Sequence, residues 1–83
     1  MKTLITKELI ERGYEVNNFY NSGLELTRSE NGYEAIATVG EENFEITVRD
    51  VDAREIVASI DFQLDTLTLE KVVKIIEVAE GCF

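Results

Sequence analysis

Residues 44–49 constrain the fold most, because apolar and polar side chains alternate along this run without a break. Successive side chains of a β-strand point to opposite faces, so the alternation predicts a strand with one face in a core and the other in water. Residues 33–39 and 55–62 alternate in the same way, and turn-forming residues separate the three runs. Residues 33–62 are therefore predicted to form an antiparallel meander.

The alternation also assigns faces to individual side chains. On 33–39 the core face is expected to hold Tyr33 and its alternate neighbours, which leaves Ile36 as an exposed apolar residue. On 55–62 the predicted inward residues are Ile56, Ala58, Ile60 and Phe62, and the predicted outward residues are Glu55, Val57, Ser59 and Asp61.

Two further strands are predicted before the meander. Residues 24–29 alternate, and the pair Asn31 and Gly32 that follows favours a type I′ turn, so 24–29 should pair with 33–39. Residues 14–20 have aromatic ends, but the central Asn17 and Asn18 predict a short or bulged strand. A turn is expected at residues 21–23.

A helix is predicted at each end of the chain. Residues 3–12 carry apolar side chains at helical spacing and end at Gly13, a residue suited to a helix C-cap. Thr68 can cap a second helix that closes at Gly81. Its apolar stripe is predicted to contain Leu69, Val72, Val73, Ile76 and Ala79.

These elements predict one domain over residues 1–83, of the α+β class. We expect two layers, with an antiparallel meander sheet of four or five strands and both helices packed on one of its faces. The stripe of the last helix needs a complementary apolar surface, and the inward face of the sheet is the only large one that the sequence offers.

The charge is strongly negative: 17 acidic and 8 basic residues give a net charge of −9, and the chain has no histidine. The basic residues are scattered, so direct binding to nucleic acid is disfavoured and a basic partner is favoured. Cys82 is the only cysteine, lies at a terminus expected to be frayed, and cannot form an internal disulfide. Neither a signal peptide nor a membrane span is recognisable, so we expect a cytoplasmic protein with no membrane partner.

No enzymatic or cofactor motif stands out. Without histidine, and with one terminal thiol, nucleophilic catalysis is not expected. The adjacent carboxylates Glu41 and Glu42 are expected in a turn, where carboxylates stay hydrated. A calcium loop beginning at Asp50 fails because Arg54 occupies a ligand position, and zinc lacks its ligands. We therefore expect neither an enzyme nor a cofactor nor a bound metal.

The negative charge gathers in the second half of the chain. Alternate residues of one strand are about 6.8 Å apart and neighbouring strands about 4.8 Å, so carboxylates on the meander could stand at phosphate-like spacing. The alternative is that an acidic surface only keeps a small protein in solution. The predicted partner-binding residues are Glu41, Glu42, Glu45, Asp50, Asp52, Glu55, Asp61 and Asp65.

In its size, its charge and its order of helix, antiparallel strands and helix, the chain resembles the small acidic inhibitors that phages encode against bacterial defence systems, in particular anti-CRISPR proteins. The resemblance implies a protein without catalysis that occupies the basic DNA-binding or PAM-reading surface of a Cas effector, as a DNA mimic, in the cytoplasm of the host cell. A second hypothesis is a structural or assembly module that forms homodimers through a sheet edge or through an exposed patch at Ile36 and Val57.

Overall fold

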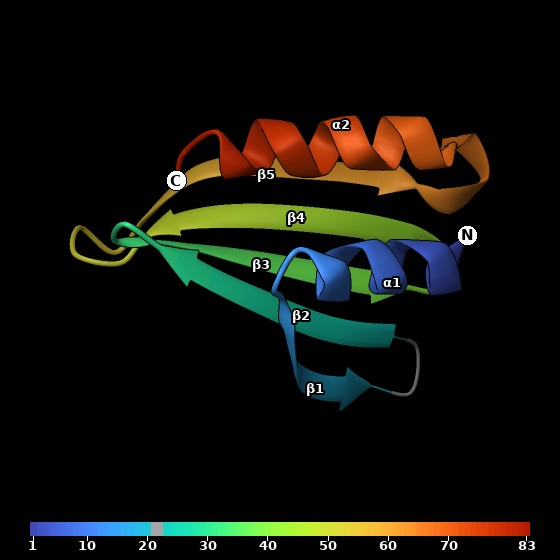
Figure 1. Ribbon diagram of the computed structural model, residues 1–83, viewed down its shortest axis with the longest axis horizontal. Coiled ribbons are helices and arrows are strands. Elements are labelled where there is room, and N and C mark those ends of the chain that lie inside the picture. Colours follow the sequence, from blue (N-terminus) through green and yellow to red (C-terminus); the bar gives the residue numbers. More distant parts are fainter. Residues whose placement is uncertain (21–22) are drawn as a thin grey trace.

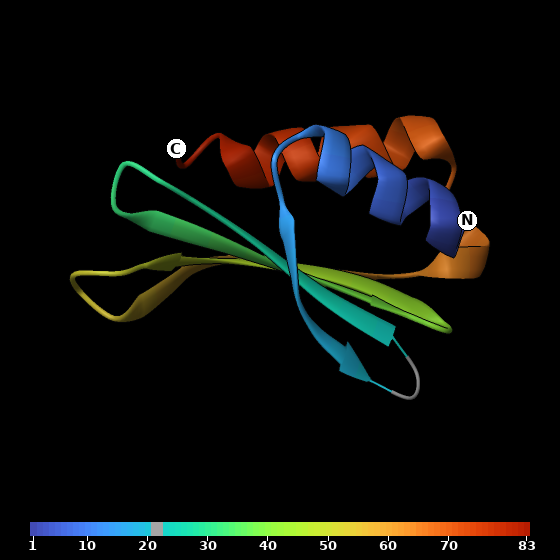
Figure 2. The same cartoon turned by 60° about the horizontal axis from the view of Figure 1, so that its bottom comes forward.

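The computed structural model describes residues 1–20 and 23–83 and confirms the predicted two-layer α+β fold. The five strands form one antiparallel meander in the order β1-β2-β3-β4-β5, and both helices lie over the same face of it (Figures 1 and 2). The predicted turn at residues 21 and 22 lies outside the described residues. The elements are α1 (Lys2–Glu11), β1 (Glu15–Tyr20), β2 (Gly23–Glu30), β3 (Tyr33–Gly40), β4 (Asn43–Asp50), β5 (Glu55–Gln63), the short 3₁₀ helix η1 (Leu64–Thr66) and α2 (Leu69–Glu80).

Local sequence fixes the pairing of the strands. Asn31 and Gly32 join β2 to β3 with φ angles of 53° and 83°, the positive values that a type I′ turn requires. The first strand is present and is bulged as predicted, because the register between β1 and β2 shifts between Val16 and Asn18.

The core lies between the helices and the inner face of the sheet. Ala35 and Ala37 on the central strand β3 are fully buried, and their small side chains leave room for α1, which packs on that strand. Thr68 caps α2 by accepting a hydrogen bond from the backbone N–H of Lys71, as the sequence predicts. The fully or almost fully buried residues include Ile5, Leu9, Leu26, Val39, Phe44, Ile46, Val48, Val72, Ile76 and Ala79.

A second bulge, at Val57 on β5, overturns part of the predicted face assignment. Ala58 still pairs with Val48, but Ile56 pairs with Arg49, so Val57 is an extra residue. Because the side-chain period is two, one extra residue moves the preceding side chains to the other face. Ile56 was predicted inward and is instead 66% exposed, while Glu55 lies opposite Asp50.

Three further expectations are met only in part at the margins of the core. Phe62 lies on the inner face but is 43% exposed, because β5 is the edge of the sheet. Leu69 begins α2 and is 41% exposed, and Val73 is only half-buried. Ile36 was expected to be exposed but is half-buried, since Thr27 and Thr47 stand on either side of it in the register.

The last residues are held in place rather than frayed. Cys82 is half-buried against the core, and the carbonyl of Phe83 accepts a hydrogen bond of 2.6 Å from Asn31 Nδ2. The Arg28 guanidinium also lies 5.1 Å from the centre of the Phe83 ring, a cation–π contact. In the described part of the chain no helix is long and apolar enough to cross a membrane.

Candidate functional site

The structure divides the eight predicted partner-binding residues between the two ends of the sheet. Glu41 and Glu42 form the β3–β4 turn, whereas Asp50 stands at the other end of β4. The seven residue steps from Asn43 to Asp50 span roughly 23 Å at about 3.3 Å per residue. The predicted array is therefore not continuous. One group, called the acidic end, contains Glu41, Glu42, Glu45, Asp61 and Asp65; the other, called the far turn, contains Asp50, Asp52 and Glu55.

Strand register brings the acidic end together. Asn43 pairs with Gln63, and Glu45 pairs directly with Asp61. The backbone N–H of Leu64 donates a hydrogen bond of 2.7 Å to the carbonyl of Glu42, which ties η1 to the β3–β4 turn and carries Asp65 to the same end. The carboxylates of this group thus come from two turns and two neighbouring strands.

Few positive charges offset the acidic end. Lys2 Nζ forms an ion pair of 2.7 Å with Glu41, the single ion pair that any of these five carboxylates makes within residues 1–20 and 23–83. Asp61 accepts a hydrogen bond of 3.3 Å from Asn43 Nδ2, which leaves its charge in place. Like charges directly opposite on neighbouring strands destabilise a sheet, so the Glu45 and Asp61 pair carries a cost that strand pairing does not require.

The acidic end also borders an open hollow of about 650 Å³. The hollow lies between the start of α1, the β3–β4 turn and η1, and its lining combines carboxylates with the side-chain amides of Asn43 and Gln63. The lining is about equally polar and apolar, and the cationic side chain of Lys2 lies in it beside the carboxylates. Its lining residues are Met1, Lys2, Glu41, Glu42, Asn43, Gln63, Leu64 and Asp65.

The far turn has a structural role of its own. Asp50 Oδ1 accepts hydrogen bonds of 3.1 Å from the backbone N–H groups of Asp52 and Ala53, so its carboxylate closes the β4–β5 turn. Arg54 follows with a φ of 57° and places a positive charge in the same turn. One of the three carboxylates of the far turn, that of Asp50, is thus engaged in holding the turn itself together.

Sequence reasoning missed Glu25 as a neighbour of the acidic end. Thr38 pairs with Glu25 on one side and with Glu45 on the other, so one row across the open face of the sheet runs through Glu25, Thr38, Glu45 and Asp61. The alternation of 24–29 already placed Glu25 outward. Only the register of three strand pairs aligns it with the other two carboxylates.

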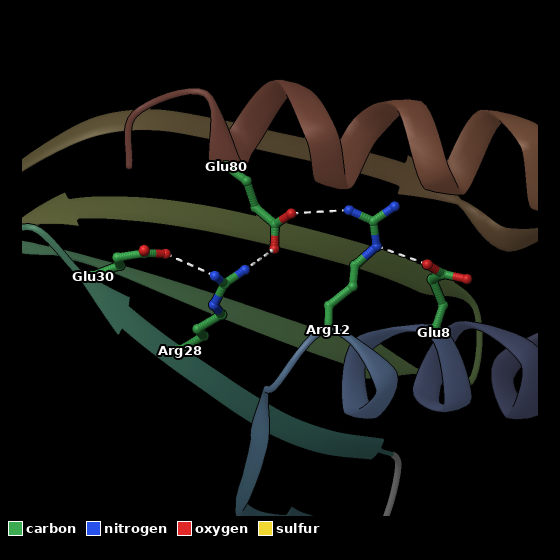
Figure 3. A network of polar contacts seen from close by, with 5 residues as sticks. All are labelled: Glu8, Arg12, Arg28, Glu30 and Glu80. Carbon is green, nitrogen blue, oxygen red and sulfur yellow. Dashed lines mark hydrogen bonds and ion pairs between the residues drawn. The ribbon is translucent and has the colours of Figure 1, made fainter.

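Other carboxylates join the two layers in an ion-pair network (Figure 3). Glu80 near the end of α2 accepts hydrogen bonds of 2.9 Å from both Arg12, which caps α1, and Arg28 on β2. Arg12 is paired in turn with Glu8, and Arg28 with Glu30, each at 2.7 Å. The Glu80 side chain is only 14% exposed, so these contacts are screened less than surface pairs. The network fixes both helices to the sheet.

Tyr14 lies beside this network and is 3% exposed. Its hydroxyl is buried beside the Glu80 carboxylate and makes no hydrogen bond of good geometry among the described residues. Burial raises the pKa of the phenol well above its ordinary value, and the negative charge of Glu80 raises it further. The hydrogen bond that Arg12 donates to the Glu8 carboxylate raises the pKa of Arg12, against the opposing effect of partial burial.

Chemically, the acidic end offers hydrated carboxylates and amides. Among the described residues no group of three or more His, Cys, Asp or Glu side chains is placed to hold a metal ion. No family model, curated protein or solved structure matches this chain. The positions and charges of its own residues are therefore what bears on its function.

Proposed function

We propose that the protein is a non-enzymatic acidic ligand that occupies the basic, nucleic-acid-binding surface of another protein. The partner class that fits is a host defence protein, such as a Cas effector, which the protein inhibits as a DNA mimic of the anti-CRISPR type. It would act without a cofactor, in the cytoplasm where such effectors bind DNA. The single observation that carries the proposal is the acidic end, where five carboxylates lie at one end of the sheet with one ion pair among them in residues 1–20 and 23–83.

The open face of the sheet supports the proposal. Both helices cover the opposite face, so the row through Glu25, Glu45 and Asp61 lies on a surface without a helix (Figure 2). Neighbouring strands are about 4.8 Å apart, against about 3.4 Å of axial spacing between phosphates along one strand of DNA, so the row is a regular series of negative charges on a similar length scale. A rigid sheet holds the carboxylates at these spacings before binding, which lowers the entropy that binding costs.

Electrostatics give the interaction a clear signature. A net charge of −9 attracts a basic groove over a distance set by the Debye length, about 30 Å at 0.01 M salt and about 8 Å at 0.15 M. Association should therefore be fast at low salt and should weaken steeply as salt rises. The far turn contributes less, because Asp50 is engaged in its own turn and Arg54 lies beside it.

The test uses a guide-loaded Cas effector and a labelled duplex that carries its PAM. The protein should release the duplex from the effector, and its affinity should fall as NaCl rises from 50 to 300 mM. The double variant Glu42→Lys with Asp65→Lys should weaken binding by about 30-fold, because each reversal removes an attraction and adds a repulsion.

A matched control carries the same change in net charge elsewhere. Glu11 on α1 and Glu77 on α2 are exposed and lie on the helical side, away from the acidic end. The double variant Glu11→Lys with Glu77→Lys should weaken binding by less than about threefold, through long-range attraction alone. Equal losses from the two double variants would contradict a defined site, and binding that DNA does not displace would contradict mimicry.

A further inference from the structure

The two edges of the sheet differ in how much regular strand they leave free. β1 has six residues and its bulge falls in the middle, at Asn17, so it offers little uninterrupted backbone. β5 has nine residues and its bulge at Val57 falls near the start, so residues 58–63 remain regular. This stretch contains neither lysine nor proline, the residues that commonly protect an edge strand from pairing.

The hydrogen bonding between β4 and β5 identifies which backbone groups of β5 are free. Leu64 N–H bonds to Glu42 C=O, so the pair of residues 42 and 64 is a hydrogen-bonded pair. Such pairs alternate along an antiparallel ladder, which makes Ile60 and Phe62 bond toward β4. The N–H and C=O groups of Ser59 and Asp61 consequently point to the open edge.

We propose that β5 pairs antiparallel with β5 of a second copy of this chain, about a two-fold axis at Ile60, to give a continuous ten-stranded sheet. This inference does not depend on the proposed function. Ser59 of one copy then lies opposite Asp61 of the other, and these pairs exchange the free backbone hydrogen bonds on both sides of the axis. The two Ile60 residues form the close, non-hydrogen-bonded pair at the centre.

Side-chain chemistry selects this register and a second copy as the partner. The Ser59 hydroxyl can donate to the Asp61 carboxylate across the new pair, and Ala58 stands opposite Phe62 on the inner face. A shift of two residues one way sets Asp61 against Asp61, which places like charges opposite each other. A shift the other way requires the bulged Val57 to pair with Asp61. Of these three registers, only the one centred on Ile60 avoids both repulsion and the bulge.

Exposed apolar side chains flank the same edge. Phe62 is 43% exposed on the inner face of β5. Val78 is 68% exposed and precedes Glu80 by two positions, which is about 200° around α2. Because Glu80 faces Arg12 at the end of α1, Val78 lies on the side of the helix opposite to α1. α2 runs along β5 in Figure 1, next to the open edge. Pairing of two copies would cover Phe62.

The first test is disulfide trapping in a Cys82→Ser background. Non-hydrogen-bonded pairs have Cα atoms about 4.5 Å apart, within the range of a disulfide, so Ile60→Cys should form a covalent dimer on mild oxidation. Phe62→Cys is the matched control on the same strand and face. In the proposed register its two copies are four residue steps apart, about 14 Å, and should cross-link at least about tenfold more slowly.

The second test uses charge at position 59, read by sedimentation across a range of concentrations. Ser59→Lys faces Asp61 of the other copy and should tighten the dimer, whereas Ser59→Glu should weaken it by about tenfold. Thr3→Lys and Thr3→Glu make the same changes in net charge on α1 and should differ little. Dimerisation should strengthen as salt rises, because salt screens the repulsion between two copies of charge −9.

Two results would overturn the proposal. Equal cross-linking of Ile60→Cys and Phe62→Cys would exclude this register. A monomer at every concentration up to about 1 mM at high salt would exclude a second copy as the occupant, and would leave the edge to a strand of another protein.

Discussion

Carboxylates occur in two environments in this protein: some stabilise the fold through ion pairs, and others are exposed on the surface. Glu80 is 14% exposed and bonds to two arginines from different elements, whereas the carboxylates of the acidic end are exposed and share one ion pair. The network joins layers that are far apart in the sequence. The acidic end makes one such contact, the ion pair between Lys2 of α1 and Glu41, and its Glu45 and Asp61 stand opposite each other with no ion pair to a cation among the described residues. Removing the charge of Glu80 should therefore lower the free energy of unfolding, whereas removing charge from the acidic end should leave it unchanged or raise it slightly.

The largest effect should come from a carboxylate placed where no arginine can reach it. Ile76 lies one helical turn before Glu80 and is fully buried. Ile76→Asp buries an unpaired charge, which costs several kcal/mol against a total stability of about 5 kcal/mol for a domain of this size. The variant should be largely unfolded by circular dichroism. Val78→Asp, on the exposed side of the same helix, should lose less than about 1 kcal/mol. Wild-type melting of Ile76→Asp would contradict the packing of α2 on the sheet.

Removal of the shared carboxylate should rank second. Glu80→Ala leaves Arg12 and Arg28 without their common acceptor, and hydrogen bonds to charged groups contribute about 1.5–3 kcal/mol each. After allowance for partial solvent access, we expect a loss of about 2 kcal/mol in urea denaturation. Glu77→Ala, an exposed carboxylate on the same helix, should lose less than about 0.5 kcal/mol. Similar losses from the two variants would mean that the network does not stabilise the fold.

The third effect in size should be a loss of folding stability at alkaline pH, caused by Tyr14 beside the ion-pair network. The folded-state pKa of Tyr14 is raised above its unfolded value of about 10, so the unfolded chain releases this proton first. The contribution of Tyr14 is fully present below pH 10 and is lost as pH rises from there toward the folded pKa. Tyr14→Phe should reduce this loss and should cost little stability at pH 7, because the hydroxyl makes no hydrogen bond of good geometry among the described residues. Identical pH profiles for the two proteins would contradict this assignment.

The smallest effect on stability should come from the acidic end. The double variant Glu42→Lys with Asp65→Lys changes two exposed residues, each expected to alter the free energy of unfolding by less than about 0.5 kcal/mol. Reduced self-repulsion in so negative a chain favours a slight gain. Chemical denaturation measures this directly. A loss as large as that of Glu80→Ala would show that the acidic end supports the fold and is not a free surface.

The sequence by itself determined the elements and most of the core. Period-two alternation, the Asn31 and Gly32 turn and the Thr68 cap are local signals, and local signals fix strands, hairpin register and helix starts. They predicted a meander of four or five strands with two helices. They also predicted that β1 would be short or bulged, because two adjacent asparagines weaken a strand.

Only the tertiary structure decided how the charges are distributed. The bulge at Val57 left no composition signal, yet it turned Ile56 outward and placed Glu55 opposite Asp50. Arg12, Arg28 and Glu80 are 16 to 68 residues apart in pairs. Nothing in the local sequence distinguishes them from charged residues on a solvated surface. Electrostatic partners are set by distance in space, which depends on how the helices cross the sheet. For that reason the net charge was readable from the chain, while the division between structural and surface carboxylates was not.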